Sequence, residues 1–391
     1  MKINKAYKLK LRPTASQEKR LLEVSDATRF VWNYYLAQKR DIYMMGGKSP
    51  NYYDCAKDLT HLKKVAGMEW LSDEGHSQAM QQTLQDQEQA YKRFFKKIAR
   101  FPRFKTKRDA RRSFRLPNCW KLKGNRLQIM KDCRVAFGGT LPPMKAKLCS
   151  LTVSRDSVGT WWASILTEQE IKPKKKTGKP IGIDVGLNHL IVTSNGLKIE
   201  NIHPRKQAQQ HLATLQRLLS RTKLQSKRRT RIRSRVARLH RKIGFKRSNY
   251  IHHVTRRIAD ENQAVIYAED LAVKNMQRNH CLASSIADAS WSECIRQLEY
   301  KQRWSGGELI KIDRYFPSSK MCSNCHHVLD RLPLSVRSWS CPRCHSKHDR
   351  DVNAARNILN QGAGCQLRVE KITDGSSKRK PRARVPTSMK R

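Results

Sequence analysis

The 391-residue chain carries 81 Lys and Arg against 32 Asp and Glu, a formal net charge of +49. A charge of that size repels itself unless a polyanion neutralises it, so nucleic acid is the first partner to consider. A basic ribosomal or membrane-surface protein would share the charge. No apolar run approaches the roughly 20 residues that span a bilayer, and the N-terminus lacks the apolar core of a signal peptide. We therefore expect a cytoplasmic protein without a membrane partner.

The first hundred residues predict one strand followed by helices. Residues 3–12 alternate apolar and basic side chains, as a half-exposed strand does. Pro13, Thr14 and Ser16 then open a helical stretch, and residues 75–100 predict a further helix that ends before Pro102. The apolar anchors of this further helix are Leu84, Tyr91, Phe94 and Phe95.

The segment ARFPRFKTKRDARRSFRL, residues 99–116, alternates cations with aromatic rings. Aromatic rings among cations can stack on bases while the charges hold phosphates. Alternatively, the rings belong to the core and the cations are solvated. We favour nucleic-acid binding here, with Arg103, Lys105 and Lys107 as contacts.

Residues 120–170 predict a group of short strands separated by turn residues. Because strand 3–12 has no local partner, we expect it to join this group in a small barrel. The segment 171–180 (IKPKKKTGKP) has the composition of a linker. The predicted strands of the group are Leu127–Met130, Arg134–Phe137, Leu151–Ser154 and Trp161–Leu166.

Three acids follow the linker, each at the end of an apolar strand or the start of a helix. Asp184 ends the strand IGID, Glu269 ends AVIYAE, and Asp351 opens the helix DVNAARNIL. A buried acid is costly unless it is paired or bound to a metal. Three converging acids would hold two Mg²⁺ or Mn²⁺ ions, which together can activate water and stabilise a leaving oxygen. The order strand, hairpin, strand, helix is typical of an RNase H-like nuclease.

Each acid taken singly has an ordinary alternative, because acids after strands often cap helices or form ion pairs. Asp349 competes with Asp351 for the third position, but an Asp just ahead of a helix usually caps it. We expect Asp270 to point away from the site. The small side chains of Ala354 and Ala355 would let the last helix pack closely on a sheet.

Four of the eleven cysteines form two pairs, Cys322-x2-Cys325 and Cys341-x2-Cys344. This spacing is typical of a structural zinc site in which four thiolates complete the coordination shell. A redox dithiol is the alternative. Four histidines lie nearby and one could replace a cysteine, but the thiolates suffice: His326, His327, His345 and His348. We predict one structural Zn²⁺ ion.

A basic helix lies between the first two acids. Residues 201–259 contain no Asp or Glu, and residues 221–247 contain thirteen Lys or Arg. Ile232, Val236, Leu239 and Ile243 form a single apolar stripe at helical spacing. A long cationic face normally contacts phosphate, which positions a strand without reading its sequence. The predicted contacts are Arg228, Arg229, Arg231, Arg235 and Arg238.

From Ile181 to Leu359 the chain resembles the catalytic half of TnpB, a transposon-encoded RNA-guided nuclease related to the type V CRISPR effectors. The motifs GIDVGLNHLIV, YAEDLAVKNM, YFPSSKMCSNC and WSCPRCHSKHDRDVNAARNI carry the resemblance. The N-terminal half matches in outline through KLKLRPTASQ, RFVWNYYLAQK and AYKRFFKKIARFPRFK. The resemblance assigns the metal-binding catalytic acids to Asp184, Glu269 and Asp351.

The resemblance also implies an α+β multidomain fold. A helical recognition lobe is inserted in a small β-barrel (wedge) domain, and an RNase H-like (RuvC) α/β nuclease domain carrying a four-cysteine zinc ribbon follows. The expected boundaries are 1–12 and 106–170 for the wedge, 13–105 for the lobe, 171–180 for the linker, 181–320 and 346–361 for the nuclease with a basic insert at 205–260, 321–345 for the ribbon, and 362–391 for a disordered basic tail.

The function implied by the resemblance is guide-directed DNA cleavage. The protein would bind a transposon-derived guide RNA (omega RNA), recognise a short motif in double-stranded target DNA, and hydrolyse phosphodiesters with Mg²⁺ or Mn²⁺. Its place would be the cytoplasm of a prokaryote, associated with the nucleoid. Two alternatives stay open: an RNase H-like transposase that joins strands without a guide, and a nuclease-inactive RNA-guided DNA-binding repressor.

Overall fold

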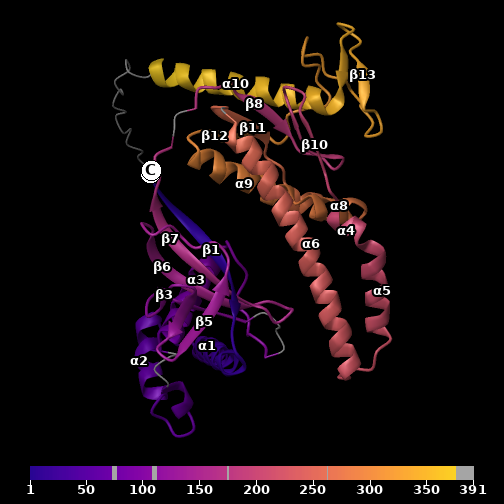
Figure 1. Ribbon diagram of the computed structural model, residues 1–391. Helices are drawn as coiled ribbons and strands as arrows, with labels where there is room; N and C mark the ends of the chain where they lie inside the picture. Colours follow the sequence, from indigo (N-terminus) through magenta and orange to yellow (C-terminus); the bar gives the residue numbers. More distant parts are fainter. Residues whose placement is uncertain (73–76, 108–111, 174–175, 262, 376–391) are drawn as a thin grey trace, which may run out of the picture. The chain divides into compact units, whose positions relative to one another are not determined.

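The computed structural model describes residues 1–72, 77–107, 112–173, 176–261 and 263–375 (Figure 1). The chain forms two compact units. Unit 1 comprises Met1–Ile171 and Gln225–Arg238, and unit 2 comprises Lys172–Leu224 and Leu239–Arg391. Among the described helices, none is long and apolar enough to cross a membrane.

Unit 1 contains a seven-stranded antiparallel sheet in which β1 is a central strand. The strand order is β2-β6-β7-β1-β5-β4-β3. β1 pairs with β5 through Leu11 and Phe137, and with β7 through Leu9 and Ala163. The predicted pairing of the N-terminal strand with the later group is therefore confirmed. The strands are β1 (Lys2–Arg12), β2 (Arg112–Leu116), β3 (Lys121–Lys123), β4 (Arg126–Met130), β5 (Cys133–Gly138), β6 (Lys147–Arg155) and β7 (Trp161–Glu170).

The expected barrel is not closed. β2 and β3 lie at the two ends of the order and do not pair with each other in the described part of the chain. The pattern of a strand predicts which of its faces is buried and how long it is, but it does not predict the partners of the terminal strands. The two end strands were also missed, since both are short and rich in cations.

The helices of unit 1 that lie between β1 and β2 in the chain are α1 (Ala15–Met44), α2 (Tyr52–Leu62), the 3₁₀ helix Glu69–Ser72, and α3 (Ser77–Phe95). Thr14 begins α1 with a capping box, since its hydroxyl accepts from the Gln17 N–H and the Gln17 side chain accepts from the Thr14 N–H. Leu21, Val24 and Ala79 join the core of the sheet. Phe95 was predicted as an anchor, but its side chain is 74% exposed because α3 ends there.

Unit 2 contains a five-stranded mixed sheet with the order β10-β9-β8-β11-β12. β8 (Ile181–Asp184), β9 (His189–Thr193) and β10 (Lys198–Glu200) form an antiparallel meander. β11 (Val265–Glu269) then adds parallel to β8, and β12 (Glu308–Ile312) adds parallel to β11.

Helices cover both faces of this sheet (Figure 1). One face packs on α6 (Lys227–Asp260), α8 (His280–Ala289) and α9 (Trp291–Trp304), and α6 contributes Ile251, Val254 and Ile258 to the shared core. The other face packs on α10 (Arg350–Gly375), where Tyr267 and Ile358 meet. The remaining elements are α4 (Pro204–Gln207), α5 (Gln209–Ser220), α7 (Val273–Met276), β13 (Ser338–Ser340) and β14 (Lys347–Asp349).

The last helix, α10, lies unusually close to β8. A Cβ added at Gly182 would come within 2.1 Å of the Ala355 carbonyl oxygen, so only glycine fits at this point of the strand. Ala354 and Ala355 are fully buried, which confirms the predicted close packing of this helix on a sheet.

The helix also runs further than the sequence predicted. α10 continues to Gly375, whereas residues from 362 onward were expected to form a disordered tail. The structure therefore corrects that expectation for residues 362–375. Residues 376–391, the rest of the expected tail, lie outside the described residues.

Candidate active site and metal centre

The three predicted acids lie on three neighbouring elements of unit 2. Asp184 ends β8 and Glu269 ends β11. These strands are parallel, with Ile183 opposite Ala268, so the two acids follow at the same edge of the sheet. Asp351 lies in the first turn of α10, the helix that packs against β8.

The electrostatics of Asp184 reflect this convergence. Burial, together with the negative charges of Glu269 and Asp351, raises the pKa of its carboxyl to about 7. Burial also raises the pKa of Glu269, although a hydrogen bond donated by the Ser318 hydroxyl opposes that shift. Glu269 and Asp351 therefore disfavour the charged form of Asp184, as a neighbouring carboxylate does.

Asp351 lies near two cationic or potentially cationic side chains. His189 Nδ1 lies 3.7 Å from Asp351 Oδ2, and Arg337 Nη1 lies 3.8 Å from Asp351 Oδ1. His189 stands at the start of β9, and Arg337 precedes β13. Neither residue was singled out from the sequence, because nothing in the chain's local pattern places them beside this acid.

Asp349 bonds the first turn of α10 and a lysine of β10. Its Oδ1 accepts a hydrogen bond of 3.1 Å from the Val352 N–H, and Lys198 Nζ lies 2.6 Å from its Oδ2. Although burial acts in the opposite direction, the hydrogen bond and charge of Lys198 hold the pKa of Asp349 below its usual value. These contacts agree with the helix-capping interpretation of Asp349.

Asp270 is engaged with Arg314, which donates from its Nη2 to the Asp270 carboxylate and from its Nε to the Asp270 carbonyl oxygen. Asp270 and Glu269 also border a cavity of about 330 Å³. Trp291 and Ile295 contribute apolar wall to this cavity, and Lys311 contributes a cation.

The donor set at the acids consists of hard carboxylate oxygens, which suit Mg²⁺ or Mn²⁺. Their ligand atoms do not form a group as tight as the cysteines do. Within the described residues, the four cysteines are the one group of three or more Cys, His, Asp or Glu whose ligand atoms all lie within 4.8 Å of one another. The acids fit a divalent cation by chemistry, and a bound cation would relieve the mutual repulsion at Asp184.

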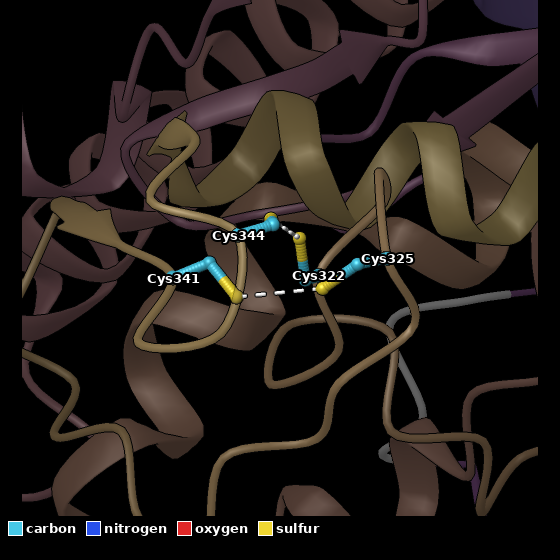
Figure 2. A group of neighbouring side chains, drawn as sticks. All are labelled: Cys322, Cys325, Cys341 and Cys344. Carbon is cyan, nitrogen blue, oxygen red and sulfur yellow. Dashed lines mark hydrogen bonds between the residues drawn. The ribbon is translucent and has the colours of Figure 1, made fainter.

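The four cysteines form a closed cluster (Figure 2). Cys322 Sγ lies 3.6 Å from Cys344 Sγ, and Cys325 Sγ lies 3.6 Å from Cys341 Sγ. Four sulfurs placed about 2.3 Å from a tetrahedral zinc ion would be separated by about 3.8 Å. The cluster could therefore hold zinc with little adjustment.

Each cysteine pair lies on a turn of the same design. The His326 N–H donates to the Cys322 carbonyl, and the His345 N–H donates to the Cys341 carbonyl. His326 and His345 both have a φ of 59°, in the left-handed region. The equivalent turns point two thiols from each pair toward one centre.

Ser346 lies against one thiol of the cluster, with its hydroxyl oxygen 3.3 Å from Cys344 Sγ. A hydrogen bond between the Ser346 hydroxyl and Cys344 Sγ lowers the pKa of that thiol to about 5. The thiolate is the form of cysteine that binds a metal. Ser346 therefore favours the metal-binding state of Cys344.

Of the four nearby histidines, His348 contacts the cluster. Its Nε2 lies 3.0 Å from Cys322 Sγ, and its ring lies 4.8 Å from that of Trp339. His348 is buried, so it is placed to bond a sulfur from outside a shell of four thiolates.

The predicted nucleic-acid contacts are solvent-accessible to different degrees. Arg228, Arg231, Arg235 and Arg238 are exposed on α6, whereas Arg229 is half-buried. In the predicted apolar stripe of the same helix, Ile232 and Ile243 are both buried.

In unit 1, the side chains of Arg103, Lys105 and Lys107 are exposed. Lys105 Nζ lies 4.1 Å from the centre of the Trp32 ring. The Arg103 and Lys105 carbonyls accept hydrogen bonds from Trp32 and Asn33, which hold this segment on α1. The segment thus has a fixed backbone, with Lys105 Nζ over the Trp32 ring and the side chains of Arg103 and Lys107 exposed.

Three family models match the chain. The model described as "Cas12f1-like, TNB domain" matches residues 291–358, and the OrfB IS605 model described as "Probable transposase" matches residues 164–280. A third, described as "Helix-turn-helix domain", matches residues 1–48, which here form β1 and the single helix α1.

Curated relatives match over nearly the whole length. A protein of Streptomyces pristinaespiralis is 36% identical, with 92% of this chain and 90% of the relative covered. InsQ of Escherichia coli K12 is 34% identical, with 100% and 99% covered. Both are provisionally named as RNA-guided DNA endonucleases. The TnpB-like protein L79 of Acanthamoeba polyphaga mimivirus is 22% identical over 51% of this chain and 41% of its own length.

A solved structure shares the fold. The Cas12f1 chain in a cryo-EM structure of its complex with single-guide RNA and target DNA superposes with a TM-score of 0.58 at 14% sequence identity. The superposition covers 92% of this chain and 99% of the Cas12f1 chain.

Proposed function

The chain belongs to the TnpB family, and from this premise we propose that it is an RNA-guided DNA endonuclease. The observation that carries the proposal is the convergence of Asp184, Glu269 and Asp351 at one edge of the unit 2 sheet. Catalysis belongs to these three acids. Relatives provisionally named for this activity, which align along most of the chain, support it.

We assign domains to the observed elements as follows. The seven-stranded sheet is a wedge-like domain, with α1 to α3 as the recognition lobe between its first two strands. The five-stranded sheet with α10 is an RNase H-like, RuvC-type nuclease domain. Its strand order, a meander followed by two parallel strands, supports this assignment. The two cysteine turns form a zinc ribbon.

The acids would hold the divalent cations. Held there, Mg²⁺ or Mn²⁺ would activate water and stabilise charge on the leaving oxygen of a phosphodiester. Asp184 and Glu269 lie side by side at the strand ends, and Asp351 approaches from α10. Neighbouring side chains orient these ligands: Ser318 bonds one oxygen of Glu269, and His189 and Arg337 lie against the two oxygens of Asp351.

Nucleic-acid specificity would come from base pairing between guide RNA and target DNA, as in other RNA-guided systems. The protein's own role would be to hold the phosphate backbones. Exposed arginines on α6 and the cationic segment at 103–107 supply the charge. The net charge of +49 agrees with two bound polyanions rather than one small ligand.

The test compares the wild type with Asp184→Ala and Glu269→Ala in cleavage of a guide-matched plasmid. Each substitution removes a cation ligand, and we expect cleavage to fall by about 10³-fold or more while RNA binding is retained. Asp270→Ala is the matched control, because this neighbouring acid is paired with Arg314. Retained metal-dependent cleavage by Asp184→Ala or Glu269→Ala would refute the assignment. Strand joining without any RNA would favour a transposase.

A further inference from the structure

Two buried asparagines on α10 bind the segment that carries the first cysteine pair. Asn353 Nδ2 donates to the Met321 carbonyl at 2.7 Å, and Asn353 Oδ1 accepts from the Ser323 N–H at 2.9 Å. Asn357 lies one helical turn further along. Its Nδ2 donates to the Met321 carbonyl at 2.6 Å and to the Ser318 carbonyl at 2.8 Å.

These bonds are costly to lose, since both asparagine side chains are buried, at 1% and 0% exposure. The bonded carbonyls belong to an irregular segment. Its buried backbone groups lack the hydrogen-bond partners that a sheet or helix provides, so side chains must supply them. Met321 and Ser323 flank Cys322, so the Asn353 amide fixes the backbone on either side of a cysteine of the cluster.

The same segment reaches the second acid. The Ser318 hydroxyl donates to Glu269 Oε1, while the Ser318 carbonyl is held by Asn357. Ser318 is buried, so its hydroxyl has a defined direction. A path of hydrogen-bonded residues thus runs from α10 through Asn357 and Ser318 to Glu269.

The helix that bears the two asparagines also supports the other two acids. Asp351 lies in its first turn, two residues before Asn353. Its Ala355 lies against Gly182, two residues before Asp184 in β8. One helix therefore supports all three acids, and the cysteine-bearing segment is fixed to that helix.

We propose that Ser318, Asn353 and Asn357 are positioning residues that couple the four-cysteine site to the carboxylate site. The inference rests on the proposed function of the three acids. When the four cysteines are held together, the backbone of residues 318–323 has a fixed position. That position in turn fixes the orientation of the Glu269 carboxylate. Ser318 acts through the Glu269 carboxylate, and the two asparagines act through the backbone around Cys322.

The experiment compares Ser318→Ala, Ser318→Thr and Asn357→Ala with Thr255→Val as a control. Thr255 is buried in the same unit, and its hydroxyl lies 2.6 Å from the Ile251 carbonyl oxygen and 3.0 Å from Gln297 Oε1, so its substitution destabilises without touching the acids. Three quantities are measured on the full chain: Mn²⁺ binding by titration calorimetry, the Mg²⁺ concentration for half-maximal cleavage, and zinc release to a chromogenic chelator.

Ser318→Ala should weaken Mn²⁺ binding and raise the Mg²⁺ requirement by about tenfold, the usual loss for an outer partner of a metal ligand. Its zinc release should match the wild type, and Ser318→Thr should restore Mn²⁺ binding because it keeps the hydroxyl. Asn357→Ala should weaken Mn²⁺ binding and also release zinc faster. Thr255→Val should change both quantities by less than about twofold.

Two results would overturn the proposal: wild-type Mn²⁺ binding in Ser318→Ala, or zinc release in Asn357→Ala no faster than in Thr255→Val. If the wild type cleaves no DNA, the proposed function fails. The Mn²⁺ and zinc measurements then still decide the coupling, because neither depends on cleavage.

Discussion

The cysteine site and the carboxylate site are built in opposite ways. The four cysteines come from a short stretch of chain, residues 322–344, on two turns of the same design, and their ligand atoms already lie within 4.8 Å of one another. The three acids come from β8, β11 and α10, spread over residues 184–351, and do not form so tight a group. A closed thiolate site suits a structural ion, whereas an open carboxylate site leaves positions for water and substrate.

The difference shows what each site requires of the fold. The cysteine site needs two short turns, which local sequence can encode. The carboxylate site needs a parallel strand pair and a helix that packs so closely on β8 that only glycine fits at position 182. It also needs a serine from the cysteine-bearing segment to bond Glu269. The residues on which the carboxylate site depends are therefore spread over a longer stretch of the chain than those on which the cysteine site depends.

The sharpest test within the carboxylate site sets Asp351 against Asp349. We expect Asp351→Ala to reduce cleavage by about 10³-fold or more, because it removes a cation ligand. Asp349→Ala should keep cleavage within about tenfold of the wild type and lose about 1 kcal/mol of stability, because it removes a helix cap. Cleavage rates and urea unfolding of both variants provide the comparison. The opposite ranking would assign the third catalytic position to Asp349.

At the cysteine site, Cys322→Ser should abolish stoichiometric zinc and lower the free energy of unfolding by several kcal/mol, about the scale of a lost structural metal site. Zinc content and thermal unfolding measure the two effects. Cys281→Ser is the matched control, because Cys281 is an exposed free thiol on α8. Equal zinc content in the two variants would contradict a four-thiolate site.

The two sites should also differ in their response to pH. The pKa of Asp184 rises from 3.8 to about 7 on folding, so the metal-free folded state keeps a proton there that the unfolded state releases near pH 4. The stability that this proton contributes is complete below pH 3.8 and is lost as pH rises to about 7. Asp184→Asn should therefore gain stability relative to the metal-free wild type between about pH 5 and pH 8. Urea unfolding of both proteins at these two pH values tests this. A difference in the free energy of unfolding that is the same at both pH values would contradict the raised pKa of Asp184.

Because Mg²⁺ binds the ionised carboxylate, its apparent affinity for the wild type should rise over the same pH range. Titration calorimetry at about pH 6 and about pH 8 measures the change. Affinity that falls with pH would contradict binding at Asp184.

The smallest expected effect lies on α6. Replacing the exposed Arg231 and Arg235 with Ala should weaken nucleic-acid binding uniformly across sequences. The slope of log affinity against log salt should fall by about 0.7–0.9 for each phosphate that is no longer neutralised. Arg256→Ala, on the same helix but already paired with Asp260 at 3.2 Å, should leave the slope unchanged. An unchanged slope in the double variant would remove these arginines from the interface.

The strand that pairs across unit 1, the three acid-bearing elements and the cysteine cluster could all be predicted from the sequence, because each has a local pattern with a physical cause. Features that depend on long-range geometry could not. The open order of the unit 1 sheet could not be predicted, because strand patterns do not determine how the end strands pair. The extension of α10 to Gly375 was missed because Gly362 and Gly364, which disfavour the interior of a helix, interrupt the pattern of the preceding helix.

The roles of Ser318, Asn353 and Asn357 were also missed. The available signal was a pair of asparagines four residues apart on a helix whose neighbouring buried positions, such as Ala354 and Ile358, are apolar. Their partners are backbone groups of an irregular segment, whose position depends on the whole of unit 2. No pattern along the chain predicts which backbone groups these side chains bond.

The most direct test of an RNA-guided nuclease that acts through three converging acids uses the protein with its own RNA. The wild type and Glu269→Ala are purified from the native locus, the RNA bound to each is sequenced, and a guide-matched plasmid library with a randomised flank is added with Mg²⁺. We predict one discrete RNA in both preparations and flank-dependent double-strand cuts with the wild type alone. Cuts by Glu269→Ala, or cuts without any bound RNA, would contradict this mechanism.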